Sequence, residues 1–147
     1  MDEQSGLGEE LRAAIGELVR ATRVEDALPA NQAAALGLLE RDGPKTTAQL
    51  AEGCRIRHQS MTAIVQHLAA RGEVGSSRHP EDGRAQLVTL TEAGRRAVAR
   101  DRQNRAARLD DVIATRLSDD EKEQLRRAIP LISRLASVGT EPKRSRA

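Results

Sequence analysis

The chain has 147 residues, of which 31% are charged; its formal net charge is +2, and it contains one cysteine and no Phe, Trp or Tyr. This length suits one domain with one core, the single cysteine excludes an internal disulfide, and the lack of a run of about 18 apolar residues argues against a membrane span. We therefore expect a cytoplasmic domain with an aliphatic core. Because such side chains bury less area than aromatic ones, we expect a second copy of the chain to supply further burial.

Basic residues are concentrated in the middle of the chain. Residues 1–53 hold five Lys and Arg against ten Asp and Glu, whereas residues 54–108 hold eleven against five. A basic segment in an otherwise balanced protein is typical of a surface that binds a polyanion, although a solvated helix face gives the same count. The charge pattern therefore indicates nucleic acid as one partner and leaves a solvated surface as the alternative.

Apolar residues at helical spacing predict two N-terminal helices. The first covers residues 7–24, with one apolar stripe formed by Leu7, Leu11, Ile15 and Leu18. The second covers residues 28–43: Pro29 suits its first turn, and Gly43 with the proline that follows ends it.

Two further helices joined by a short linker follow. Thr46 can cap a helix over residues 46–54 by accepting from an amide three residues on, and Gly53 is expected to end it. The second helix covers residues 57–72, with Gly72 as its terminator. Two helices joined by a tight turn are typical of a helix-turn-helix, whose second helix enters the major groove of DNA.

The outward face of this second helix is polar but mostly uncharged. Small hydrogen-bonding side chains suit base edges better than they suit mere solubility, and an ordinary solvated face is the alternative. The residues on this face are His58, Gln59, Ser60, Thr62, Ala63 and Gln66.

A hairpin is predicted next, with strands over residues 74–78 and 85–90 and a turn of sequence HPEDG between them. A ribbon beside a recognition helix reaches the neighbouring minor groove, whose negative potential attracts arginine. Arg84 lies near the tip, and Asp82 is expected to accept hydrogen bonds from its guanidinium and hold it extended. A helix-turn-helix followed by such a hairpin predicts a winged helix-turn-helix.

The C-terminal part predicts two more helices. Thr91 caps a long helix with an arginine-rich exterior, and Ser118 opens a capping box for the last helix. The basic tail, residues 139–147, is expected to be disordered. The fold class is thus mainly α, with about six helices and a two-stranded wing.

From Leu28 to Val98 the chain resembles the MarR family of bacterial winged-helix regulators. The matching stretches are Leu28 and Gln32, the TAQLA pattern of residues 47–51, Ser60, Thr62 and residues 68–72 of the recognition helix, and PEDGRAQLVTLTEAGR in the wing. The family's wing signature falls on Asp82, Arg84, Leu90 and Thr91.

This resemblance implies a homodimer that binds a pseudo-palindromic operator in double-stranded DNA, usually as a repressor released by a small molecule or an oxidant. It implies a DNA-binding lobe over residues 28–96 and dimerisation helices over residues 5–24 and 97–138. The expected dimer contacts are Leu7, Leu11, Ile15, Leu18, Ile129, Ile132 and Leu135.

The resemblance also places Ser60 and Thr62 at the DNA face and makes Arg84 the wing arginine, supported by Asp82. To these the helical projection and the base of the wing add Arg57, His58, Gln59, Ala63, Gln66 and Arg78. Members of the family often carry Arg where this chain has Ala63, so base contacts must come from shorter or neutral groups.

The effector is less well indicated. Family pockets for planar ligands are commonly lined by aromatic residues, which this chain lacks. Either an aliphatic pocket with Arg or His anchors takes a small lipophilic or anionic effector, or the ligand is of another kind, or there is none. Cys54 is expected to be a half-buried thiol at a helix end, with a redox switch as the alternative, since Arg55 and Arg57 lie close enough in sequence to lower its pKa.

Other function classes find little support. His58, His67 and His79 lack the spacing of a metal site, no cofactor motif is present, and no nucleophile and base pair indicates an enzyme. The rival hypothesis is a winged helix that binds an acidic protein partner, which would favour exposed apolar residues on the recognition helix.

Overall fold

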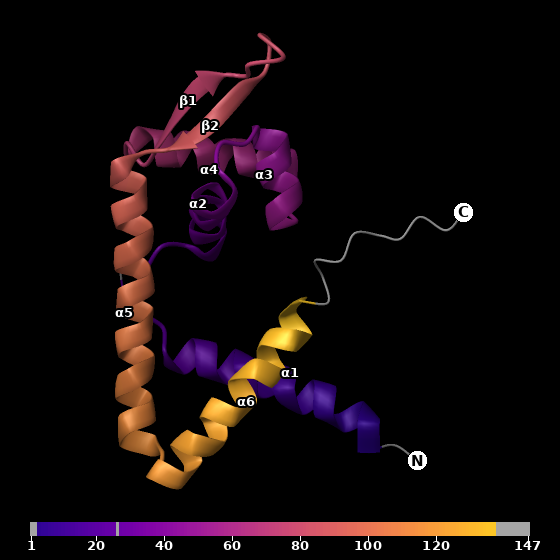
Figure 1. The fold of residues 1–147 in the computed structure, drawn as a ribbon, viewed down its shortest axis with the longest axis vertical. Coiled ribbons are helices and arrows are strands. Elements are labelled where there is room, and N and C mark those ends of the chain that lie inside the picture. The colour runs from indigo at the N-terminus through magenta and orange to yellow at the C-terminus, as the bar shows by residue number, and fades with distance from the viewer. Residues whose placement is uncertain (1–2, 26, 138–147) are drawn as a thin grey trace, which may run out of the picture. The chain divides into compact units, whose positions relative to one another are not determined.

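The computed structural model describes residues 3–25 and 27–137 of the chain, which form six helices and two strands (Figure 1). The elements in chain order are α1 Glu3–Ala21, α2 Ala30–Asp42, α3 Thr47–Cys54, α4 His58–Ala70, β1 Val74–Arg78, β2 Gln86–Leu90, α5 Glu92–Arg116 and α6 Asp119–Ser137. Their contacts divide the chain into two compact units, residues 1–108 and 109–147. None of the described helices is both long and apolar enough to cross a membrane.

The core of the first unit is aliphatic, as the composition predicts. Its fully buried large side chains come from α2, α3 and α4: Leu36, Leu50, Met61 and Leu68. Val74 and Val88 of the hairpin and Val98 of α5 complete the cluster. The helix-turn-helix, the hairpin and the start of α5 therefore share one core, which holds α4 and the hairpin in fixed positions.

The hairpin is antiparallel, with Val74 opposite Leu90 and Arg78 opposite Gln86. It is also joined to the segment between α2 and α3. The backbone N–H of Val88 donates to the carbonyl of Lys45 at 2.8 Å, and the N–H of Lys45 donates back to Val88 at 3.2 Å. This bridge ties the base of the hairpin to the entrance of the helix-turn-helix.

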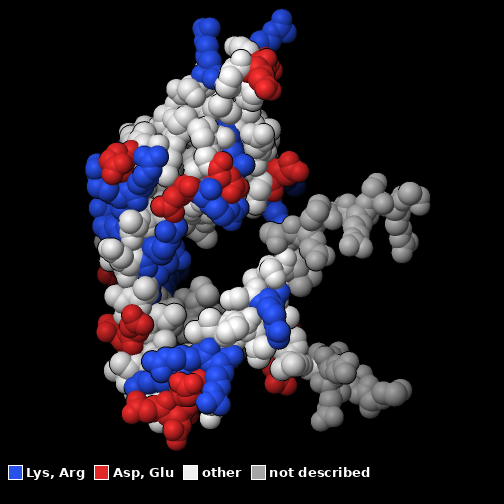
Figure 2. Space-filling view, in the orientation of Figure 1, with Lys and Arg blue, Asp and Glu red and all other residues white. Residues whose placement is uncertain are grey.

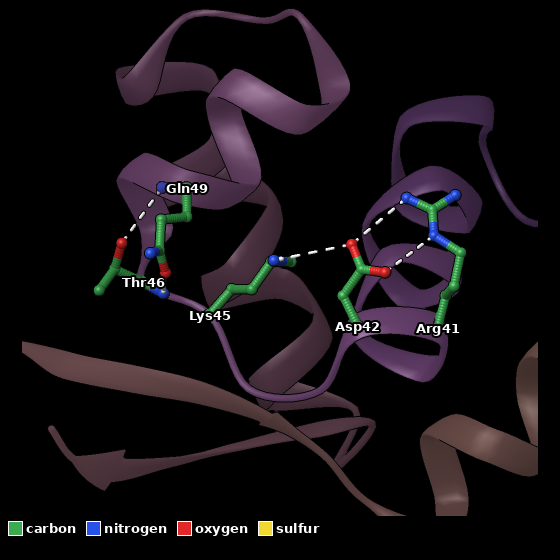
Figure 3. A network of polar contacts seen from close by, with 5 residues as sticks. All are labelled: Arg41, Asp42, Lys45, Thr46 and Gln49. Carbon is green, nitrogen blue, oxygen red and sulfur yellow. Dashed lines mark hydrogen bonds and ion pairs between the residues drawn. The ribbon is translucent and has the colours of Figure 1, made fainter. Parts of the chain in front are cut away.

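The predicted cap of α3 is confirmed (Figure 3). The hydroxyl of Thr46 accepts from the backbone N–H of Gln49 at 3.1 Å, and the Gln49 side chain accepts from the N–H of Thr46 at 2.9 Å. Beside this capping box, the carboxylate of Asp42 lies 2.9 Å from Arg41 Nε and 3.7 Å from Lys45 Nζ. These contacts fix the short connection between α2 and α3.

Two of the predicted helix terminators are confirmed and one is wrong. Gly43 and Gly72 follow α2 and α4 with φ of 82° and 71°. Gly53, however, lies within α3. A Cβ there would come within 2.5 Å of Leu38 Cδ2 on α2. The glycine allows the two helices to approach closely, and α3 ends after it, at Cys54.

The residue that ends α3 is Arg55, in the left-handed conformation with φ 55° and ψ 41°. It is the one non-glycine residue with positive φ in the described part of the chain. For a residue with a Cβ this conformation costs about 1–2 kcal/mol.

The start of α5 is fixed against the end of α4. Thr91 Oγ1 accepts from the N–H of Gly94 at 3.1 Å and donates to the carbonyl of Gly72 at 2.6 Å, so the predicted cap is confirmed. A Cβ at Gly94 would overlap the carbonyl of Glu73, so this turn of α5 needs glycine. The hairpin is thereby held between two anchored helices.

A second set of contacts joins α5 to the start of α2. Asp101 Oδ1 accepts from the N–H of Leu28 at 2.8 Å, and Arg105 donates to the carbonyl of the same residue at 3.0 Å. The two side chains also pair with each other, with Arg105 Nε 2.8 Å from Asp101 Oδ2. Both polar groups of the buried Leu28 backbone are thus satisfied by one ion pair.

The stripes predicted to form a dimer interface are largely uncovered in the single chain. The exposed large apolar side chains of α1 include Leu7, Ile15 and Leu18, and those of α6 include Ile129, Ile132 and Leu135, while Leu11 is half-buried. The predicted disordered tail, residues 139–147, lies outside the described residues.

Candidate nucleic-acid interface

The predicted DNA face of α4 is open to solvent. Met61 and Leu68 are buried on the inner side of the helix. Thr62 is half-buried, and its hydroxyl donates to the carbonyl of His58 at 3.0 Å. The hydroxyl oxygen can therefore still accept a hydrogen bond from a ligand. The other predicted residues of the helix and its N-cap are exposed: Arg57, His58, Gln59, Ser60, Ala63 and Gln66.

The N-terminus of α4 differs from those of α3, α5 and α6. Its N-cap is Arg57, which makes no side-chain cap, and its first turn contains no acidic residue. The other three begin with Thr46, Thr91 and Ser118, each of which accepts from a backbone N–H three residues on. The first N–H groups of a helix without a cap carry partial positive charge into solvent, which favours anions.

The wing carries two exposed arginines, Arg78 at the end of β1 and Arg84 in the turn. The predicted role of Asp82 is corrected here. Its carboxylate accepts from the backbone N–H of Arg84 at 3.0 Å, and the guanidinium of Arg84 has no ion-pair partner among the described residues. Asp82 therefore shapes the turn, because a short acidic side chain satisfies the backbone two residues on, and leaves the arginine free to extend.

Arginines near the recognition helix and arginines of α5 differ in their partners. Within the described ranges no carboxylate lies within 4.0 Å of Arg55, Arg57, Arg78 or Arg84. Four arginines of α5 have such partners: Arg95, Arg96, Arg102 and Arg105. In Figure 2 basic side chains project from the hairpin end next to an acidic surface, and blue and red surfaces also adjoin along much of the rest of this face. Guanidinium groups without a carboxylate partner among the described residues thus lie around α4 and the wing, as they also do at Arg100, Arg108 and Arg116 of α5.

A pocket of about 670 Å³ lies on the first unit, between the outer side of α2, the end of α3 and α5. It is lined by Ala34, Gly37, Leu38, Glu40, Arg41, Gly53, Cys54 and Arg102. Its two arginines are both engaged, Arg102 with Glu40 at 2.8 Å and Arg41 with Asp42 at 2.9 Å. The lining combines small and apolar side chains with the charged groups of Glu40, Arg41 and Arg102, and it includes the thiol of Cys54.

Cys54 is partly buried, as expected for a thiol at a helix end. Burial raises its pKa above the ordinary value, because a thiolate loses hydration there. The lowering of this pKa by Arg55 and Arg57 that the sequence suggested is therefore wrong. Elsewhere, residues 3–25 and 27–137 hold no group of three or more His, Cys, Asp and Glu that could bind a metal ion.

Comparison with known proteins identifies the family. Residues 28–85 match the MarR family model. A helix-turn-helix transcriptional regulator of Mycobacterium bovis is 34% identical over 145 residues, which cover 97% of this chain and 99% of the relative. The chain belongs to the MarR family. It is accordingly a MarR-family transcriptional regulator, and the predicted winged helix-turn-helix fold is confirmed.

Two solved structures of similar proteins cover nearly the whole MarR-family chain. A Pseudomonas aeruginosa protein assigned as a transcriptional regulator has 28% identity and a TM-score of 0.81, covering 92% of this chain and 97% of that one. The PcaV transcriptional regulator from Streptomyces coelicolor, solved in complex with its natural ligand, has 27% identity and a TM-score of 0.56, covering 93% and 94%.

Two features of this region were not predicted from the sequence. The left-handed residue that follows α3 is Arg55, whereas the helix-end rule selects Gly53. The ion pair of Asp101 and Arg105 on Leu28 was also missed. A spacing of four between an acid and a base indicates a helical pair. Nothing in the sequence indicates that Asp101 also accepts a hydrogen bond from the backbone of Leu28, which is 73 residues away.

Proposed function

We propose that this regulator binds a specific double-stranded DNA operator as a homodimer, with α4 in the major groove and the hairpin at the adjacent minor groove. The observation that carries the proposal is the meeting of two features on one side of the first unit. The exposed face of α4 carries neutral hydrogen-bonding side chains, and three arginines near it, Arg57, Arg78 and Arg84, have no carboxylate partner among the described residues. A surface of free guanidinium groups beside neutral polar side chains suits phosphates and base edges together.

The proposed roles divide by chemistry. Gln59, Ser60, Thr62 and Gln66 would contact base edges, because amides and hydroxyls match the groups that bases present in the major groove. His58 and Ala63 would line the same groove, the latter against a thymine methyl. Arg57 and Arg78 would contact phosphates, and Arg84 would enter the minor groove, with Asp82 holding the turn.

Dimerisation is supported by the exposed apolar stripes of α1 and α6, since a soluble chain rarely leaves so many large apolar side chains uncovered. We assign residues 28–96 to DNA binding and residues 5–24 and 97–138 to dimerisation. Two copies related by a twofold axis would place two α4 helices on successive major-groove faces, which matches a pseudo-palindromic operator. A regulator of this kind would act in the cytoplasm, where bacterial DNA is.

We further propose repression that a small molecule relieves. PcaV, a relative solved with its natural ligand, supports ligand control. The pocket beside Cys54 is lined by apolar side chains together with the guanidinium groups of Arg41 and Arg102, which suits a small lipophilic or anionic effector. The alternative in which α4 binds a protein is less well supported, because the exposed apolar residues of α4 are all small alanines: Ala63, Ala69 and Ala70.

The test is a gel shift on the DNA upstream of the protein's own gene and on random duplex, at several salt concentrations. Replacing Arg84→Ala should weaken binding to both and reduce the slope of log K against log salt by about 1 per chain. Replacing Gln59→Ala should instead change preference at one base pair, by about 1–3 kcal/mol. Absence of salt-dependent binding by the unaltered protein, or equal losses on both duplexes for Gln59→Ala, would refute the corresponding assignment.

A further inference from the structure

Arg55 occupies a conformation that disfavours its own side chain. Its φ of 55° and ψ of 41° place it in the left-handed region, where the Cβ crowds the following carbonyl and glycine is the favoured residue. The backbone geometry itself is needed, because the N–H of Arg55 donates to the carbonyls of Ala51 and Glu52 and so ends α3. Glycine would make the same backbone bond without the crowding.

No contact of the Arg55 side chain within the described chain offsets the cost of this backbone conformation. The side chain of Arg55 is exposed, and it makes no hydrogen bond or ion pair with any described group. The other exposed arginines nearby in sequence at least adopt favourable backbone conformations, as Arg57 does with φ −67°. A strained residue without an internal contact points to a partner outside the chain.

The position of Arg55 indicates what that partner is. It lies two residues before Arg57, the N-cap of α4, in the turn that joins the two helices of the helix-turn-helix. A recognition helix contacts bases mainly through its N-terminal part, and a helix about 10–12 Å across nearly fills a major groove about 12 Å wide. The turn that leads into that end therefore lies at the rim of the groove, where the phosphates are.

We propose that Arg55 is a further phosphate contact of this protein, and that the strained turn is retained because it places a guanidinium at the rim of the major groove. This inference rests on the proposed DNA binding. The inference about Arg55 adds one prediction to the proposed DNA binding. Replacing Arg55 should make the protein more stable and its DNA complex weaker, whereas replacing an ordinary surface arginine should not stabilise the protein.

The experiment compares Arg55→Gly with Arg55→Lys in the full chain. Arg55→Gly should raise the melting temperature by about 2–4 °C, the shift expected for roughly 1 kcal/mol in a chain of this size. It should also lower the slope of log K against log salt by about 0.9 per chain, on operator and random duplex alike. Arg55→Lys retains both the charge and the strain, so its melting temperature and salt slope should stay close to those of the unaltered protein.

Arg95→Gln is the matched control, since it removes one exposed arginine that is already paired with Glu92. It should leave the salt slope nearly unchanged. If the unaltered protein binds DNA with a clear salt slope and Arg55→Gly keeps that slope, or loses stability, the inference about Arg55 is overturned while DNA binding stands. If the unaltered protein shows no salt-dependent binding, the proposed function fails and this inference fails with it.

Discussion

Two groups of arginines in this chain have the same chemistry and different surroundings. Three arginines near α4 and in the hairpin, Arg57, Arg78 and Arg84, have no carboxylate partner among the described residues. Four of the seven arginines of α5 do have one: Arg95 and Arg96 lie near Glu92, Arg102 lies 2.8 Å from Glu40, and Arg105 pairs with Asp101. A paired guanidinium must leave its acid before it can bind a phosphate, whereas an unpaired one needs only to release water and counterions.

The difference shows what a charge count leaves out. Residues 54–108 carry an excess of basic side chains that includes both groups. The pairing divides this excess into a part available to a polyanion and a part that acts within the fold, as Arg105 does at the backbone of Leu28. We infer that the region around α4 and the wing contributes most of the electrostatic affinity for DNA.

The largest expected effect tests this division directly. Replacing Arg57 and Arg78 together by Ala should weaken DNA binding by about 100-fold near 0.1 M salt and reduce the salt slope by about 2 per chain, because two phosphate contacts are lost in each copy. Fluorescence anisotropy with operator and random duplex at four or five salt concentrations measures both quantities.

The matched control replaces Arg95 and Arg102 of α5 by Ala, which removes the same charge from the paired group. Its affinity should stay within about threefold of the unaltered protein, since distant exposed charges are largely screened at this ionic strength. Equal losses of DNA affinity in the two double variants would show that total charge, rather than pairing and position, governs binding. The proposed difference between the two groups of arginines would then be wrong.

Much of the fold could be predicted from the sequence because its signals are local. The caps at Thr46, Thr91 and Ser118 were found from spacing alone, since a capping side chain and its N–H are three residues apart. The turn glycines Gly43 and Gly72 were found for the same reason, because the required φ is a property of one residue. The aliphatic core followed from composition.

The features that were missed depend on contacts between distant segments. Gly53 looks like a helix end in sequence, and only the approach of Leu38 explains why it is a packing position instead. The carboxylate of Asp82 could equally serve a guanidinium or a backbone N–H, and the three-dimensional turn selects the second. The difference between paired and unpaired arginines was likewise hidden, because partners such as Glu40 and Arg102 are 62 residues apart.

The structural role of the paired group gives the next prediction. Asp101→Ala should lower the free energy of unfolding by about 1–3 kcal/mol, because the buried N–H of Leu28 loses its acceptor and Arg105 its partner. Urea unfolding at one protein concentration measures this change as a lower midpoint with the same m value.

Asp101→Asn sharpens the result. The amide oxygen can still accept from the N–H of Leu28, while the charge that pairs with Arg105 is gone, so the loss should be clearly smaller than for Asp101→Ala. Neither variant should change the salt slope of DNA binding. If the salt slope of DNA binding became steeper in either variant, the unpaired Arg105 would be binding DNA. That result would contradict a purely structural role for Arg105.

The smallest expected effect concerns Cys54, whose pocket is lined by two arginines of the paired kind, Arg41 and Arg102. Because burial raises the pKa of this thiol, a smaller fraction is thiolate in the folded chain than in the unfolded chain at the same pH. Alkylation by iodoacetamide near pH 8 should therefore be several-fold slower in the native protein than in urea, with Cys54→Ser as the blank.

The same shift fixes the sign of a pH dependence. A group that is kept protonated by folding contributes its stabilisation in full below the pKa of the unfolded thiol, and the contribution is lost as the pH rises through the higher value of the folded state. The unfolding free energy of the unaltered protein should thus fall slightly more than that of Cys54→Ser on the alkaline side. Faster alkylation in the native state would show that a guanidinium is free to stabilise the thiolate, which would place the arginines of this pocket in the unpaired group and restore a redox role for Cys54.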